Sequence, residues 1–210
     1  MRDLLCTLIV LPFVCGCGEE PSTKKDIGSQ VEALIEKLAI SEEPAGKKPI
    51  YSPDRDTPKT DKRVIAYEAA CELKKHGKRA FPFLLRHLDD KRQSVAFRRV
   101  IPHDVGDACF CIIRDQVFCL PKDYRGSIYR TGGDGKMHER AYFSAPDLFT
   151  YKTIGPWLEA RKGKSLEAMQ VEALEWLIEQ EKRIGFQDEE AKKKFLYPLE
   201  RQLAVLRKKG

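Results

Sequence analysis

Four polar residues in this sequence are best suited to acid–base chemistry or to metal binding: His103, Asp104, Asp107 and His138. Imidazole and carboxylate groups exchange protons or bind a cation when they converge on one pocket. Asp104 and Asp107 also stand three residues apart at an expected helix start, where carboxylates cap the helix and favour its dipole. Both interpretations remain open, and convergence of the four side chains would decide between them.

The motifs of well-defined enzyme classes do not occur in the chain. There is no G-x-S-x-G elbow, no H-E-x-x-H helix and no glycine-rich phosphate loop before a lysine. The segment Gly132–Gly135 has the composition of a turn instead. A hydrolase-type enzyme that uses the four polar residues is therefore an alternative hypothesis, and no motif predicts a cofactor.

Four cysteines form a second group with chemical potential: Cys71, Cys109, Cys111 and Cys119. The C-x-C spacing of Cys109 and Cys111 suggests a metal site, but residues two apart on a helix point to nearly opposite sides. Zinc sites also favour cysteine pairs separated by two to four residues. We expect buried apolar cysteines rather than metal ligands, while an oxidising compartment would allow three pairings of the four thiols.

The N-terminal residues have the pattern of an export signal. Leu4 to Val14 form an apolar run that is too short to span a bilayer. The residues that follow, Val14-Cys15-Gly16-Cys17, resemble the lipobox of bacterial lipoprotein precursors. This resemblance implies that residues 1–16 are removed and that Cys17 carries lipid. It also implies a membrane-anchored protein of the cell envelope, facing the periplasm or the exterior.

The composition predicts a folded domain after a polar tether at residues 17–28. Charged residues make up 33% of the 210 and hydrophobic residues 42%, which lies within the globular range. The net charge of +6 is scattered along the chain and no nucleic-acid motif is present, so we expect no nucleic-acid partner. Residues 29–210 are long enough for one domain with its own core.

Hydrophobic periodicity predicts a mainly α fold for this domain. Prolines make residues 41–60 a loop, and Ser29 is expected to cap the first helix together with Glu32. A proline at residue 198 should kink or restart the last helix. The expected helical ranges are 29–40, 61–76, a segment opening at 81, 94–100, 104–118, 157–162, 165–185 and 187–209.

One stretch resembles a HEAT-type helical repeat. Its sequence, VIAYEAACELKKHGKRAFPFLLRHLDD, contains an alanine-rich helix, a glycine turn and a helix that opens with proline. No second copy follows at the expected period, and a solenoid needs neighbouring repeats to bury its faces. The resemblance therefore implies a HEAT-like hairpin within a compact helical domain.

Residues 120–149 interrupt the helical pattern with glycines and aromatic residues. The segments 128–131 and 140–144 flank the glycine turn and are expected to pair as a hairpin. Exposed aromatic residues on such segments commonly bind partners, although a lid over the core is an equally open interpretation. The candidate contact residues are Tyr124, Tyr129, Tyr142, Phe143 and Phe149.

These observations favour a protein-binding or scaffolding module over an enzyme. The lipobox-like segment supplies the location, and helical repeats commonly present surfaces to protein partners. The expected partners are a membrane, through lipid on Cys17, and a protein whose identity the sequence does not give. The alternative is an envelope-located hydrolase built on His103, Asp104, Asp107 and His138.

Overall fold

The computed structural model describes residues 26–39, 58, 60–94, 96, 103–124, 128–144 and 148–208. In these ranges the chain is mainly helical, with two short antiparallel strand pairs, which confirms the predicted fold class. The helices are α1 (Ile27–Glu36), α2 (Lys62–Lys75), α3 (Phe81–Arg86), α4 (Val105–Phe118), α5 (Ala141–Ser144), α6 (Ile154–Glu159), α7 (Leu166–Ile184), α8 (Glu189–Phe195) and α9 (Tyr197–Arg207). The short 3₁₀ helices are η1 (Gly77–Ala80) and η2 (Lys122–Tyr124), and the strands are β1 (Gln93–Ser94), β2 (His103–Asp104), β3 (Tyr129–Thr131) and β4 (Met137–Glu139).

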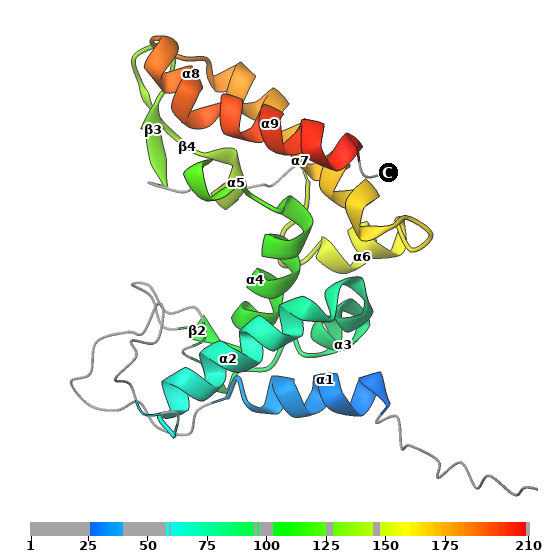
Figure 1. Cartoon of the computed structure of the whole chain (residues 1–210). Helices are drawn as coiled ribbons and strands as arrows, with labels where there is room; N and C mark the ends of the chain where they lie inside the picture. The colour runs from blue at the N-terminus through cyan, green and yellow to red at the C-terminus, as the bar shows by residue number, and fades with distance from the viewer. Residues whose placement is uncertain are drawn as a thin grey trace, which may run out of the picture.

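Helix α4 runs between two groups of elements (Figure 1). At one end of the molecule lie α1, α2 and α3, and at the other lie α7, α8, α9 and the hairpin β3–β4. Helix α4 packs against α2, α3 and α7, and one cluster of buried apolar residues passes through both groups. Its fully buried Ile112 and Ile113 lie within this cluster, so α4 connects the two groups through the core.

Several predicted helix ends are confirmed because their signals are local. Asp104 and Asp107 form a capping box at the start of α4, and the side chain of Ser165 caps α7. Gly185 ends α7 with a φ of +75°, which favours glycine. Pro198 lies in the first turn of α9, where its missing amide removes no helical hydrogen bond.

Several predicted elements were wrong in detail, among them the short helix expected at 157–162, which is α6 at Ile154–Glu159. Helix α1 begins at Ile27, before Ser29, and Asp26 occupies the cap position without a side-chain cap. Ser94, expected in a helix, pairs with His103 as part of a strand. The second strand of the glycine-turn hairpin is Met137–Glu139, which lies closer to the turn than the expected 140–144, and Ala141–Ser144 is helical. A tighter turn gives the hairpin the shorter connection that antiparallel strands favour.

Some predictions lie outside the described residues. These are the signal segment, Cys17 and nearly all of the proline-rich loop at 41–60. The HEAT-type resemblance also stays a prediction, although α2, η1 and α3 form where it expects helices. Among the helices of the described ranges, none combines the length and the apolar content required to cross a bilayer.

Candidate functional site

The hairpin β3–β4 presents large apolar side chains to solvent. Tyr129 is 54% exposed, Met137 is 68% exposed, and Ile128, just before β3, is 47% exposed. The strand register pairs Thr131 with Met137 and Tyr129 with Glu139, so Tyr129 and Met137 share one face of the hairpin. In the part of the chain that the structure describes, the one other large apolar residue with comparable exposure is Val205 on α9.

The opposite face of the hairpin is fixed to α7 by a buried ion pair. Arg130 donates from Nε to the Oε2 atom of Glu181 at 2.7 Å, and both side chains are almost fully buried. The same guanidinium donates to the backbone oxygens of Glu181 at 3.0 Å and Gly185 at 2.8 Å. Several bonds to one planar group hold β3 in a single orientation on the C-terminal turn of α7.

Tyr124 and Arg140 complete this buried polar cluster. The Tyr124 hydroxyl donates to Oε1 of Glu181 at 2.6 Å, and Arg140 donates to the backbone oxygen of Tyr124 at 2.8 Å. The Arg140 guanidinium also lies 4.1 Å from the centre of the Tyr124 ring. Burial, together with the Glu181 charge, raises the pKa of Tyr124, so this residue remains a neutral donor at physiological pH.

Glycines allow the hairpin turn to approach α7 closely. A Cβ atom on Gly132 would lie 2.7 Å from Cδ2 of His138 and 2.8 Å from the backbone oxygen of Ile184. The neighbouring Gly133 donates from its backbone to the same Ile184 oxygen at 3.1 Å. The turn, the ion pair and the strand pairing together make the hairpin a firmly supported projection of the surface.

Most of the predicted contact residues do not lie on this surface. Tyr124 and Phe149 are buried in the core, so their assignment to a contact surface was wrong and the alternative, coverage of the core, describes them. Tyr142 is partly buried and donates to Asp115 at 2.7 Å, and Phe143 stacks edge-on against it. Only Tyr129 of the five is strongly exposed.

Sequence reasoning missed Met137 and Ile128 as surface residues. The available signal was the position of Met137 two residues after the last glycine of the turn and two residues before the charged Glu139. This spacing places both side chains on one face of a strand, and the charge marks that face as exposed. The pattern at 137–139 was missed because the second strand was expected at 140–144.

Of the acid–base candidates whose side chains the structure describes, Asp104 and Asp107 contact each other, whereas His138 lies apart from them. Asp104 accepts from the Asp107 backbone at 2.7 Å as part of the capping box, and it also pairs with Lys91 at 3.0 Å. His138 hydrogen-bonds to Asp134 at 2.9 Å within the hairpin, near the opposite end of the molecule from β2 (Figure 1). The backbone of His103 belongs to β2, and its side chain lies outside the described residues.

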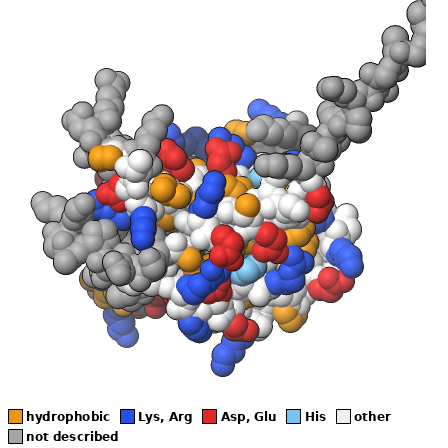
Figure 2. Space-filling view, turned by 90° about the horizontal axis from the view of Figure 1, so that it is seen from below, with side chains coloured by type: hydrophobic (Ala, Val, Ile, Leu, Met, Phe, Trp, Pro, Cys, Tyr) orange, Lys and Arg blue, Asp and Glu red, His pale blue; other side chains and the backbone are white. Residues whose placement is uncertain are grey.

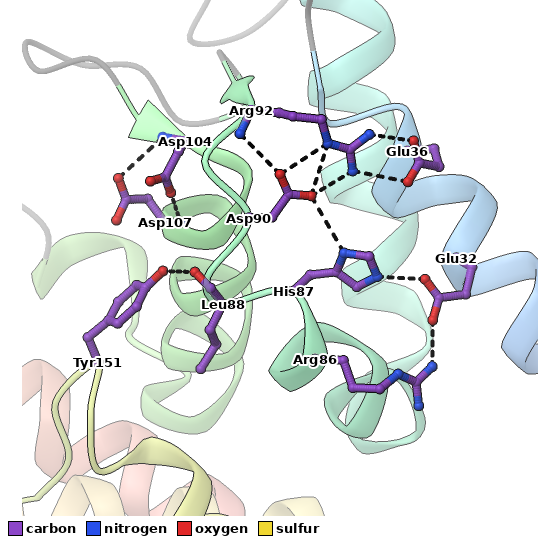
Figure 3. A network of polar contacts seen from close by, with 10 residues as sticks. All are labelled: Glu32, Glu36, Arg86, His87, Leu88, Asp90, Arg92, Asp104, Asp107 and Tyr151. Atoms are coloured by element: carbon purple, nitrogen blue, oxygen red, sulfur yellow. Dashed lines mark hydrogen bonds and ion pairs between the residues drawn. The ribbon is translucent and has the colours of Figure 1, made fainter.

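A different set of charged residues forms a network between α1 and the turn after α3 (Figure 3). His87 lies between Glu32, at 2.7 Å, and Asp90, at 3.6 Å. Arg92 donates to both Asp90 and Glu36, and its hydrogen bonds lower the pKa of Asp90 to about 2. Each of these carboxylates is paired with a cation or a histidine, which suits a link between elements better than a reactive centre.

The surface near this network carries mixed charge. Figure 2 shows acidic and basic side chains next to one another around a histidine, on the side of the molecule that lies lowest in Figure 1. Exposed ion pairs of this kind contribute little to stability individually.

The four cysteines carry free thiols. Cys109 is buried, and burial raises the pKa of its thiol to about 12. Burial also raises the pKa of Cys111, whose sulfur lies 3.6 Å from a nitrogen of Arg114. The described ranges hold no group of three or more histidine, cysteine or acidic side chains that is arranged to hold a metal ion.

No protein-family model, curated protein or solved structure matches this chain. Function must therefore be inferred from the exposed hairpin and from the N-terminal sequence.

Proposed function

We propose that this chain is a lipid-anchored protein of the bacterial cell envelope that binds a protein partner, and that the face of hairpin β3–β4 bearing Tyr129 and Met137 belongs to the contact surface. The observation that carries the binding proposal is the exposure of both side chains on a hairpin whose other face is fixed by the ion pair of Arg130 with Glu181.

Exposed aromatic and methionine side chains are enriched in protein interfaces and supply much of their binding energy. A supported hairpin also loses little conformational freedom on binding, so more of the contact energy is retained as affinity. Tyr129 and Met137 combine both properties, whereas Val205 is a single exposed side chain on a helix.

The location rests on the sequence around Cys17. A lipid-modified Cys17 would anchor the chain to a membrane surface, since several acyl chains bind a bilayer far more strongly than one. Asp26, where the described domain begins, follows Cys17 by nine residues. At about 3.5 Å per residue, such a tether would keep the domain within about 30 Å of the anchor.

The anchor is tested by expressing the full chain in a bacterial host and comparing it with the Cys17→Ser variant. We expect a lipid-sized mass increment on native Cys17 and a membrane-associated protein, with both lost in the serine variant. An unmodified protein in the soluble fraction would overturn the proposed location.

The contact surface is tested in the same cells by photo-crosslinking. A benzophenone amino acid replaces Tyr129 in one variant and Val205 in a matched control. We expect a discrete crosslinked protein with the probe at position 129 and none with the probe at position 205. Equal crosslinking from both positions would reject the hairpin as the specific contact surface.

A further inference from the structure

The hydrogen bonds of the hairpin define which backbone groups of β4 point outward. Gly132 donates to the Lys136 oxygen at 2.8 Å, and Arg140 donates to the Ile128 oxygen at 2.9 Å. Antiparallel strands alternate between hydrogen-bonded and non-hydrogen-bonded residue pairs. This alternation makes Tyr129–Glu139 and Thr131–Met137 the non-hydrogen-bonded pairs of the hairpin.

The amides and carbonyls of Met137 and Glu139 therefore point away from β3. Within the described ranges no other strand lies on that side of β4, because β3 and β4 form a two-stranded sheet. Both residues are also exposed. Strand β4 thus presents an open sheet edge with two outward donors and two outward acceptors, the arrangement that a further strand can extend.

The side chains beside this edge specify what kind of strand would fit. Met137 and Glu139 lie two residues apart on one face, so an added strand would place same-face side chains next to both. Met137 offers an apolar contact. The carboxylate of Glu139 forms no ion pair with any other described residue, so it favours a cationic neighbour.

We propose that β4 is a docking edge for an extended segment of the partner protein, which adds a third strand to the hairpin. The segment carries an apolar residue beside Met137 and a lysine or arginine beside Glu139, two positions apart. Main-chain hydrogen bonds supply affinity in this mode of recognition, and the alternate side chains supply specificity. This inference rests on the proposed protein-binding function and names the chemistry of the partner.

A second copy of this chain fits the edge less well. Antiparallel pairing of β4 with itself across a two-fold axis would set Glu139 beside a methionine and leave its charge without a cation. The unpaired carboxylate therefore favours a basic segment from another protein.

The test uses the full chain with Cys17→Ser and a capped peptide, Val-Thr-Lys-Thr-Val-Thr-Lys-Thr, which alternates valine and lysine on one face. Backbone amide shifts and hydrogen exchange are followed by NMR. We expect shifts centred on β4 and slower exchange of the Met137 and Glu139 amides. A peptide N-methylated at the amides facing β4 should bind at least about tenfold more weakly, because two main-chain hydrogen bonds are lost. Glu139→Lys should weaken binding of the unmodified peptide.

Two results would overturn the docking edge: no binding of the peptide, or equal binding of the N-methylated form. The outcome is separate from that of the proposed function. If the edge fails while the probe at position 129 still captures a protein in cells, the contact surface remains and only strand addition is rejected. If the peptide does not bind and the probe at position 129 also captures no protein, the binding function is rejected as well.

Discussion

Arg130 on β3 and Glu181 on α7 form an ion pair of 2.7 Å in which both side chains are almost fully buried. Tyr124 donates to the other oxygen of the same carboxylate, and Arg140 lies 3.8 Å from it. Taking these charges out of water is costly, and only their mutual contacts offset that cost. The cluster therefore ties the orientation of the hairpin to the C-terminal turn of α7.

Glu181→Gln should destabilise the protein by about 3–5 kcal/mol, because it removes the negative charge that balances the buried guanidinium of Arg130. The matched control is Glu175→Gln on the same helix, where an exposed pair with Arg207 predicts a change of about 1 kcal/mol or less. Urea unfolding midpoints compare the two. Equal losses of stability in the two variants would show that the buried pair of Arg130 with Glu181 is no more important than an exposed one.

Gly106→Ala should destabilise the protein by about 1–3 kcal/mol. The added Cβ would collide with the backbone oxygen of Leu88 and the hydroxyl of Tyr151, where α4 crosses the turn after α3. Gly163→Ala provides the comparison, since it lies in the turn after α6 with open space around its Cβ position and should change the stability by about 1 kcal/mol or less. Thermal unfolding of both variants measures the difference, and a neutral Gly106→Ala would contradict the close crossing.

Acid should weaken the network around Asp90. Hydrogen bonds from Arg92 hold the folded-state pKa of Asp90 at about 2, below its ordinary value of 3.8. Because this pKa is lowered, the ionised Asp90 carboxylate stabilises the folded state at neutral pH, and this stabilisation is lost as the pH falls from about 4 towards 2. Asp90→Asn should therefore reduce the pH dependence of the unfolding free energy in this range. An unchanged pH dependence in Asp90→Asn would contradict the assignment.

Thiol labelling should distinguish the cysteines by burial. Cys109 is fully buried with a pKa of about 12, so we expect it to react with iodoacetamide at pH 8 only after unfolding. Cys71, which is partly exposed, should react before Cys109. Peptide mass mapping with and without denaturant measures both. If Cys109 is labelled in the native protein, its thiol is not buried. If it stays unlabelled in denaturant without reductant, its thiol is not free.

The fold was predictable where the signals were local. Asp104, Ser165, Gly185 and Pro198 each set a helix end through neighbouring residues, and all four predictions are confirmed. The error at Ser29 has a physical cause, because α1 begins beside Phe83 and Asp26, and Ser29 falls inside the first turn. A capping residue indicates a helix start only when tertiary contacts do not extend the helix past it.

The candidate site was less predictable, because it depends on contacts between residues distant in the chain. Arg130 and Glu181 are separated by 51 positions, and a glutamate on an amphipathic helix is usually exposed. The aromatic residues of the irregular region were expected at the surface, yet Tyr124 bonds to Glu181 and Phe149 packs against Trp157. Composition does not indicate which side of such a segment faces the core.

Partner binding should depend on the exposed face of the hairpin and not on its stability. With the photo-crosslinking residue at position 129, Met137→Ser should lower the yield of the crosslinked partner by at least about fivefold, as loss of about 1 kcal/mol from an interface predicts. The unfolding midpoint should stay unchanged, because Met137 is 68% exposed. Val205→Ser removes an exposed apolar side chain from α9 and should change neither quantity. Equal loss of crosslinking in both variants would point to general surface hydrophobicity and contradict a specific hairpin contact.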